Sequence, residues 1–180
     1  MPQSILIVAA SLILGLMALS RHDGMAQDTR DHEQRAIEVA ALRVAERWAS
    51  TARDLSFDAA DVSNPEVRVR NDTDGLSAVL GPEAGEDLSD PRTFDDVDDF
   101  HGFTRTETVP LGPGTSTTTF DVSIEVTYAR VSTWSPTSGA TTAKLATVTV
   151  QESGTKPRGR NPVRLQLPVR FTPAQQFVRQ

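Results

Sequence analysis

The feature that most constrains this chain is an uncharged apolar run near its N-terminus. The run reads ILIVAASLILGLMAL and covers fifteen residues from Ile5 to Leu19, and the charged residues RHD follow shortly after it. An α-helix rises 1.5 Å per residue, so the run spans roughly 22 Å as a helix, which is less than the ~30 Å hydrocarbon core of a bilayer. We therefore expect residues 1–24 to form an apolar helix that needs its flanking residues to cross a membrane.

A cleaved secretory signal is an alternative explanation of the same run. Its length suits the apolar part of a signal peptide, but the preceding residues MPQS include no Lys or Arg for the basic part. The best small-residue cleavage site, at Gly24, Met25 and Ala26, fits the A-x-A pattern poorly. The sequence favours a retained helix, and a secreted domain that begins near Gln27 stays an alternative.

An amphipathic pattern continues directly from the apolar run, so we expect a second helical segment over residues 25–56. No Pro or Gly interrupts the chain from Asp28 to Leu55. Apolar residues recur there at spacings of three and four, which places them on one helix face: Ile37, Ala41, Val44, Trp48, Ala52 and Leu55. We expect this face to pack against a sheet, with Trp48 in the core, and we expect any bend in the helix at Gly15 or Gly24.

The remaining chain divides into a loop-rich segment, residues 57–119, and a β-rich segment, residues 120–180. Gly, Pro, Asp and Ser are frequent in the first segment, which leaves only short strand candidates such as Val67–Val69. In the second segment, apolar and polar residues alternate over 120–128, 144–152 and 163–171, a pattern typical of strands with one buried face.

We expect these three strands to form an antiparallel sheet. The Pro- and Gly-containing stretch Ser135–Thr141 supplies the turn between the first two strands. Pro168 has no N–H for a ladder hydrogen bond, so the third strand is expected at an edge or a bulge. A long helix whose apolar face covers an antiparallel sheet makes a two-layer α+β domain.

Composition and motifs argue against several functions. The net charge of −6 and the scattered Lys and Arg residues argue against nucleic-acid binding. Without Cys there is no disulfide, no thiolate nucleophile and no Cys-based zinc site. The three histidines, His22, His32 and His101, lie far apart in the sequence and outside any catalytic or metal-binding motif. We expect a protein that is not an enzyme and has no cofactor.

Calcium is the one metal for which the sequence offers ligands. The weak candidates are Asp95, Asp96, Asp98 and Asp99, which supply the oxygen ligands that calcium prefers. No spacing among them matches a known calcium loop, so the sequence favours a solvated, turn-forming acidic loop. Asn71 lies in an N-x-T sequence and is a weak candidate for glycosylation.

The order of these segments resembles the type IV pilin and pseudopilin family, the subunits of bacterial surface filaments and of secretion pseudopili. The family also begins with an apolar helix and an amphipathic continuation, followed by a loop-rich middle and an antiparallel sheet. Two segments add to the resemblance: FDDVDDFHGF at Phe94–Phe103 looks like the acidic segment of minor pilin-like proteins, and TTAKLATVTV at Thr141–Val150 looks like their late strand. The resemblance covers most of the chain and implies a pilin-like α+β fold.

The resemblance implies a structural subunit of an extracellular filament that polymerises with itself as a helical homopolymer. Other pilin-like subunits and an assembly machinery are further implied partners, and the inner membrane holds the chain before assembly. The implied assembly residues all lie in the apolar run: Ile5, Leu6, Ile7, Val8, Leu12, Ile13, Leu14, Leu16, Met17 and Leu19. A monomeric, membrane-anchored extracytoplasmic binding domain is the alternative function.

The N-terminus departs from the family pattern in two ways. The family's leader, a basic stretch that ends in glycine, is not seen before the apolar run, and Ile5 stands at the fifth position, where the mature family members carry a glutamate. In the family this carboxylate pairs with the N-terminus of a neighbouring subunit. We therefore expect this chain to assemble without that pairing.

Overall fold

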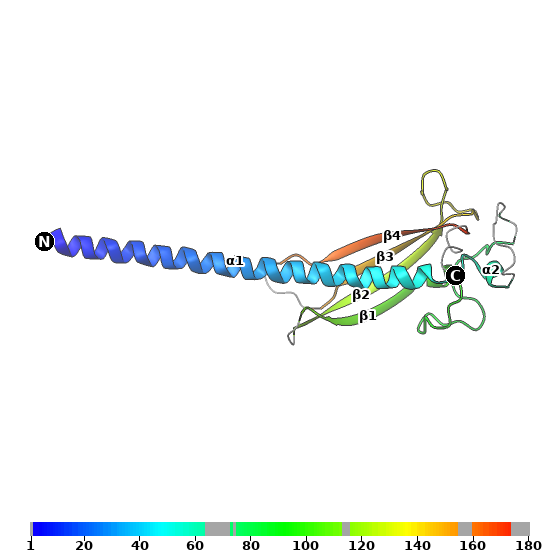
Figure 1. The fold of residues 1–180 in the computed structure, drawn as a ribbon, viewed down its shortest axis with the longest axis horizontal. Helices are drawn as coiled ribbons and strands as arrows, with labels where there is room; N and C mark the ends of the chain where they lie inside the picture. The colour runs from blue at the N-terminus through cyan, green and yellow to red at the C-terminus, as the bar shows by residue number, and fades with distance from the viewer. Residues whose placement is uncertain (1, 64–72, 74, 113–115, 155–159, 174–180) are drawn as a thin grey trace.

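The computed structural model describes residues 2–63, 73, 75–112, 116–154 and 160–173. In the first half of the long helix it describes the side chains of Leu14 and Met17 and those from Gln27 onward. A long helix lies along one face of a four-stranded sheet and extends far beyond it (Figure 1). This arrangement confirms the expected α+β architecture.

Helix α1 comprises Pro2–Arg53, 52 residues, and it continues through both Gly15 and Gly24. The helix therefore does not open at either glycine. Among the described side chains of α1, burial begins at Ile37, and only the C-terminal part of the helix lies on the sheet (Figure 1). The preceding part of the helix is roughly 50 Å long at 1.5 Å per residue.

The sheet is an antiparallel meander with the strand order β1-β2-β3-β4. Its strands are β1 (Phe103–Pro110), β2 (Thr117–Tyr128), β3 (Lys144–Glu152) and β4 (Arg164–Phe171). The three predicted strands are confirmed as β2, β3 and β4, and β2 begins three residues earlier than expected, at Thr117 instead of Phe120.

Strand β1 was not predicted. Its residues lie in the segment 57–119, which the sequence predicted to be loop-rich. Its inner face pairs Phe103 with Ile124 of β2, and the next inward positions are occupied by Arg105 and Glu107. With charged residues at two inward positions, the strand does not show the apolar alternation by which strands are recognised. The short helices α2 (Ala59–Ser63) and η1 (Asp98–Phe100, a 3-10 helix) also lie in this segment. The candidate strand Val67–Val69 falls outside the described residues.

The core lies between α1 and the inner face of the sheet. Trp48 is 6% exposed, which confirms it as a core residue, and it packs on Phe103 with ring centroids 4.7 Å apart. The buried helix residues are mostly small, which lets the helix backbone approach the strands closely: Ile37, Ala40, Ala41, Val44, Ala45, Trp48, Ala49 and Ala52. They face buried aromatic and β-branched sheet residues that include Phe120, Val122, Ile124, Val148, Val150 and Val169.

Strand β4 is an edge of the sheet, as Pro168 predicts. Glu152 N donates a 2.8 Å hydrogen bond to Val163 O, and hydrogen-bonded pairs in an antiparallel ladder recur at every second residue. Pro168 is out of phase with these pairs, so its backbone groups face away from β3. Its missing N–H therefore leaves every β3–β4 hydrogen bond intact.

Candidate functional site

The first candidate site is the free N-terminal part of α1. Of the ten assembly residues implied by the resemblance, the structure describes the side chains of Leu14 and Met17, and each is 67% exposed. The other eight side chains lie outside the described part of the structure. Within the part that the structure describes, no helix is both long and apolar enough to cross a membrane.

The second candidate site is the acidic segment before β1. It sits beside the end of α1, where Ser56 and Asp96 form a parallel β-bridge. The expectation of a solvated acidic loop is wrong, because Asp96, Asp98 and Asp99 are completely buried and only Asp95 is exposed.

These acids are buried because apolar residues alternate with them. Phe94, Val97 and Phe100 recur at every third position of the segment FDDVDDF, and all three belong to the core. The ring of Phe100 packs edge-on against Phe94, with centroids 5.0 Å apart. The apolar spacing inside the acidic segment is a sequence signal that would have predicted this burial.

One of the buried acids, Asp98, belongs to an ionic network around Lys144. Lys144 is completely buried, and its Nζ donates hydrogen bonds to Asp98 Oδ1, to Asp58 Oδ2 at 2.9 Å and to Phe57 O at 2.7 Å. The ammonium group also lies over the Phe57 ring, 4.7 Å from its centroid. One ammonium group thus contacts two buried carboxyl groups, which offsets part of the cost of burying them.

Further hydrogen bonds hold Asp58 in place. It accepts hydrogen bonds from the backbone N–H groups of Ala60 and Ser77, and Tyr128 Oη lies 3.4 Å from its Oδ2. Burial opposes ionisation of Asp58, but attraction to Lys144 and these hydrogen bonds outweigh it and lower the pKa of the carboxyl. Asp58 is therefore an ionised member of the network.

Sequence reasoning missed both Lys144 and Asp58. Lys144 occupies an inward position of β3, in phase with the buried Ala146, Val148 and Val150. A single charge in such an apolar series requires a buried partner of opposite charge. The sequence therefore indicates that Lys144 has a buried acidic partner, but it does not identify that partner.

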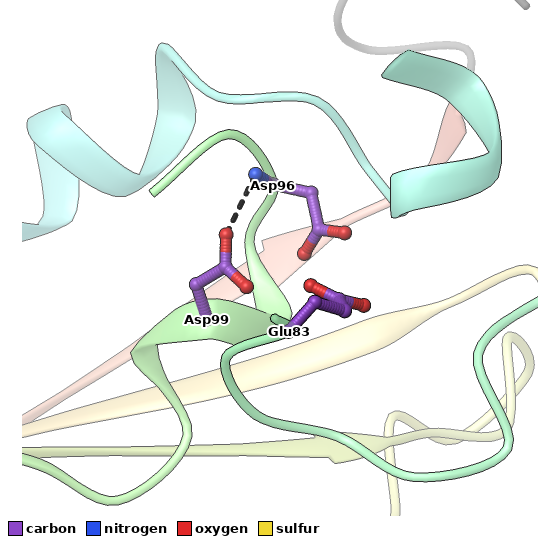
Figure 2. A group of neighbouring side chains, drawn as sticks. All are labelled: Glu83, Asp96 and Asp99. Atoms are coloured by element: carbon purple, nitrogen blue, oxygen red, sulfur yellow. Dashed lines mark hydrogen bonds between the residues drawn. The ribbon is translucent and has the colours of Figure 1, made fainter. Parts of the chain in front are cut away.

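A second set of acids lies next to this network, and we call it the acidic cluster: Glu83, Glu86, Asp95, Asp96 and Asp99. Carboxylate oxygens of Glu83, Asp96 and Asp99 all lie within 4.8 Å of one another, and so do those of Glu86, Asp95 and Asp99. Figure 2 shows the carboxylates of Glu83 and Asp96 facing each other, with that of Asp99 beside them. Asp99 belongs to both groups and therefore lies at the centre of the cluster.

Backbone hydrogen bonds position the buried members of the cluster. Asp99 Oδ2 accepts hydrogen bonds from Asp95 N at 2.9 Å and from Asp96 N at 3.0 Å, and Asp96 Oδ1 accepts one from Asp98 N at 2.8 Å. The other oxygens of the two buried carboxylates, Asp96 Oδ2 and Asp99 Oδ1, are buried and have no hydrogen-bond partner among the described residues. Each carboxylate thus uses one oxygen to hold its position and directs the other at its acidic neighbours.

The environment makes ionisation of these acids unfavourable. Burial, the hydrogen bond to Asp98 and repulsion by it raise the pKa of Asp96 to about 10. Burial is also the largest cause for Asp99, whose pKa rises to about 8. Burial likewise raises the pKa of Glu83 and of Asp95. In the absence of a cation, Asp96 and Asp99 therefore hold protons at neutral pH.

Of the remaining candidate residues, the two histidines whose side chains the structure describes take no part in these sites. His101 Nδ1 accepts a 3.3 Å hydrogen bond from Val126 N, and His32 is exposed on α1. The glycosylation candidate Asn71 and the side chain of His22 lie outside the part of the chain that the structure describes.

No family model, curated protein or solved structure matches this chain. The resemblance to type IV pilins therefore rests on the residues and on the helix-and-sheet architecture given above.

Proposed function

We propose that this chain is a structural subunit of an extracellular, type IV pilus-like filament and that it assembles through the N-terminal part of α1. The observation that supports this proposal is the length of α1 relative to the sheet. The helix continues for 52 residues, but only its C-terminal part packs on the domain, and the apolar side chains of Leu14 and Met17 stand exposed. Large apolar side chains that are exposed on a helix segment beyond the packed domain are typical of an interaction surface.

The same apolar surface serves the chain before and after assembly. Before assembly, the run Ile5–Leu19 lies in the inner membrane, where its side chains contact lipid. During assembly, helices of neighbouring subunits replace the lipid, so the apolar residues stay out of water throughout. Contacts of this kind between unlike surfaces of successive copies do not close, and they generate a helical polymer that can include other pilin-like subunits.

Electron microscopy of material sheared from the surface of producing cells tests this proposal. We expect filaments that antibodies against the β-sheet domain label. If the chain stays entirely in the membrane fraction and no filament is labelled, the filament proposal is wrong and the chain is a monomeric, membrane-anchored domain. Mass spectrometry of the mature N-terminus tests the remaining alternative, because a start near Gln27 would identify a secreted domain without the apolar helix.

A further inference from the structure

The acidic cluster has no basic partner within the part of the chain that the structure describes. Lys144 donates hydrogen bonds directly to Asp58 and Asp98. Among the described residues, no Lys or Arg forms an ion pair with Glu83, Glu86, Asp95, Asp96 or Asp99. The carboxyl groups of four acids thus converge on that of Asp99, and within the described part of the chain none of the five has a basic ion-pair partner.

Two buried oxygens indicate where a ligand would bind. Among the described residues, Asp96 Oδ2 and Asp99 Oδ1 are buried without a hydrogen-bond partner, and their side chains are completely buried. Asp98 Oδ2 is also without a partner, but the other oxygen of that carboxylate contacts Lys144. Figure 2 shows the carboxylate of Asp96 directed at that of Glu83, with only acceptor atoms facing each other. Buried acceptors are normally paired, so unpartnered oxygens in a group of carboxyls that lie within 4.8 Å of one another favour a shared proton or a cation between them.

The geometry suits a hard divalent cation. Calcium binds carboxylate oxygens at 2.3–2.6 Å, so two oxygens on one ion are at most about 5 Å apart. The carboxylate oxygens of Glu83, Asp96 and Asp99 satisfy this condition, since they all lie within 4.8 Å of one another. Glu83 is exposed, which leaves a side of the group open to solvent for entry of the ion and for water ligands.

We propose that Glu83, Asp96 and Asp99 bind one calcium ion, with Glu86 and Asp95 contributing negative charge around it. The ion would neutralise the buried carboxylates and join the loop that carries Glu83 to η1 at the start of β1. It would thereby fasten the loops at the end of the molecule opposite the free N-terminus (Figure 1). Calcium is preferred to magnesium because it accepts an irregular set of six to eight oxygen ligands, whereas magnesium demands a near-octahedral one.

Titration calorimetry and thermal unfolding test this proposal on the full chain in detergent at pH 7.5, after dialysis against EDTA. We expect one equivalent of calcium to bind, with a dissociation constant on the order of 10⁻⁴ M or below. The midpoint of unfolding should then rise steadily with the logarithm of free calcium, because the ion binds only the folded chain. Magnesium at the same concentration should give a smaller rise.

Two variants and a control identify the ligands. Asp96→Asn keeps the oxygen that accepts the hydrogen bond from Asp98 N, and Glu83→Gln changes an exposed side chain, so both variants should fold. Each should weaken calcium binding about 10-fold or more, since even residues that only orient a metal ligand cost about 10- to 100-fold. Glu125→Gln, which removes an exposed charge on β2, should bind calcium as the original chain does.

The proposal is wrong if the original chain neither binds calcium nor shows a calcium-dependent midpoint, because the acids are then simply protonated. It is also wrong if Glu125→Gln and the two cluster variants lose affinity equally, since calcium would then bind general surface charge. An equal response to magnesium would overturn the assignment to calcium. None of these outcomes depends on filament formation, so the calcium site and the filament are tested separately.

Discussion

Lys144 Nζ lies 2.9 Å from Asp58 Oδ2, and both side chains are completely buried although the two residues are 86 positions apart in the sequence. Asp58 follows the end of α1, Lys144 begins β3, and the third member of the network, Asp98, begins η1. The network therefore joins the helix, the sheet and the acidic segment at one point.

Removal of the buried cation should be strongly destabilising. We expect Lys144→Met to lower the free energy of unfolding by about 3–5 kcal/mol, because Asp58 and Asp98 would remain buried without a positive partner. Urea unfolding followed by circular dichroism measures the change. Arg164→Met, which removes an exposed charge on β4, should change stability by less than about 0.5 kcal/mol. A loss as small for Lys144→Met as for this control would show that the network is not ionised.

The hydrogen bond between Trp48 and Glu107 supports a second prediction. Trp48 Nε1 donates a 3.1 Å hydrogen bond to Glu107 Oε1, and the Arg47 guanidinium contacts the same carboxylate. Glu107→Ala should cost about 1–3 kcal/mol, because the indole N–H loses its acceptor in a partly buried position. Glu107→Gln keeps an acceptor and should retain most of the stability. Urea unfolding measures both, and equal losses in the two variants would contradict a role for the hydrogen bond.

The close packing of α1 on the sheet predicts that larger residues will not fit there. Ala45 has no exposed surface at the contact with the sheet. We expect Ala45→Leu to lower the free energy of unfolding by about 1–3 kcal/mol, since the added atoms would displace the helix or the strands. Ser50→Leu places the same side chain on the exposed face of the helix and should have little effect on stability. Thermal unfolding of the two variants measures the difference. Equal unfolding midpoints for Ala45→Leu and Ser50→Leu would contradict the prediction.

The acidic cluster should make stability depend on pH when calcium is absent. The pKa of Asp99 is about 8 and that of Asp96 about 10 in the folded chain, against about 3.9 in an unfolded chain. Between about pH 4 and pH 8 the folded chain thus holds protons that the unfolded chain has released. The free energy of unfolding should therefore fall as pH rises, by an amount of order 1 kcal/mol per pH unit.

Urea unfolding in EDTA at pH 5, 6, 7 and 8 measures this dependence. The titratable groups near the pair are Asp98, Lys144 and the other members of the acidic cluster, Glu83, Glu86 and Asp95. The lowered pKa of Asp58 confines its own effect to pH values below about 4. The double variant Asp96→Asn, Asp99→Asn should show a much flatter profile, whereas Glu125→Gln should keep the slope. A flat profile in the original chain would contradict the raised pKa values.

The exposed apolar helix predicts the effect of one charge on assembly. We expect Leu14→Asp to abolish labelled filaments, because a carboxylate within an apolar contact costs about 2.5–3.5 kcal/mol at each repeat of the polymer. Val79→Asp is the matched control, since Val79 is also apolar, is 83% exposed and lies in the loop-rich segment. Immunogold counting of filaments compares the two. If Leu14→Asp assembled normally, the free part of α1 would not be the polymer contact.

The sequence predicted the elements in which burial follows a simple period. The helix stripe through Val44 and Trp48 and the strands β2, β3 and β4 all repeat apolar residues at the spacing of their secondary structure. Strand β1 could not be found in this way, because its inward Arg105 and Glu107 are satisfied by contacts with α1 residues about sixty positions away. The spacing of apolar residues within one segment does not show which distant residues will contact it.

The sequence predicted several acidic residues of the candidate site, but it did not predict that they are buried. The sequence identified Asp95, Asp96, Asp98 and Asp99 as a possible calcium site and favoured a solvated loop, because acidic residues are usually exposed. It did not include Glu83 and Glu86, which a loop brings to Asp96 and Asp99. Only the folded chain shows that Lys144 pairs with Asp98, whereas no described Lys or Arg pairs with Asp96 or Asp99.

Pro168 affects whether the sheet edges of two copies of this chain can pair with each other. In a filament, neighbouring domains would stand side by side at very high local concentration, where exposed sheet edges tend to join and seed disordered aggregates. The outer edge of β4 lacks a donor at Pro168, so a strand from another copy that paired there would leave one of its carbonyl groups without a partner. In the proposed filament, this proline would thus favour growth along the helices over irreversible pairing between sheets of neighbouring copies.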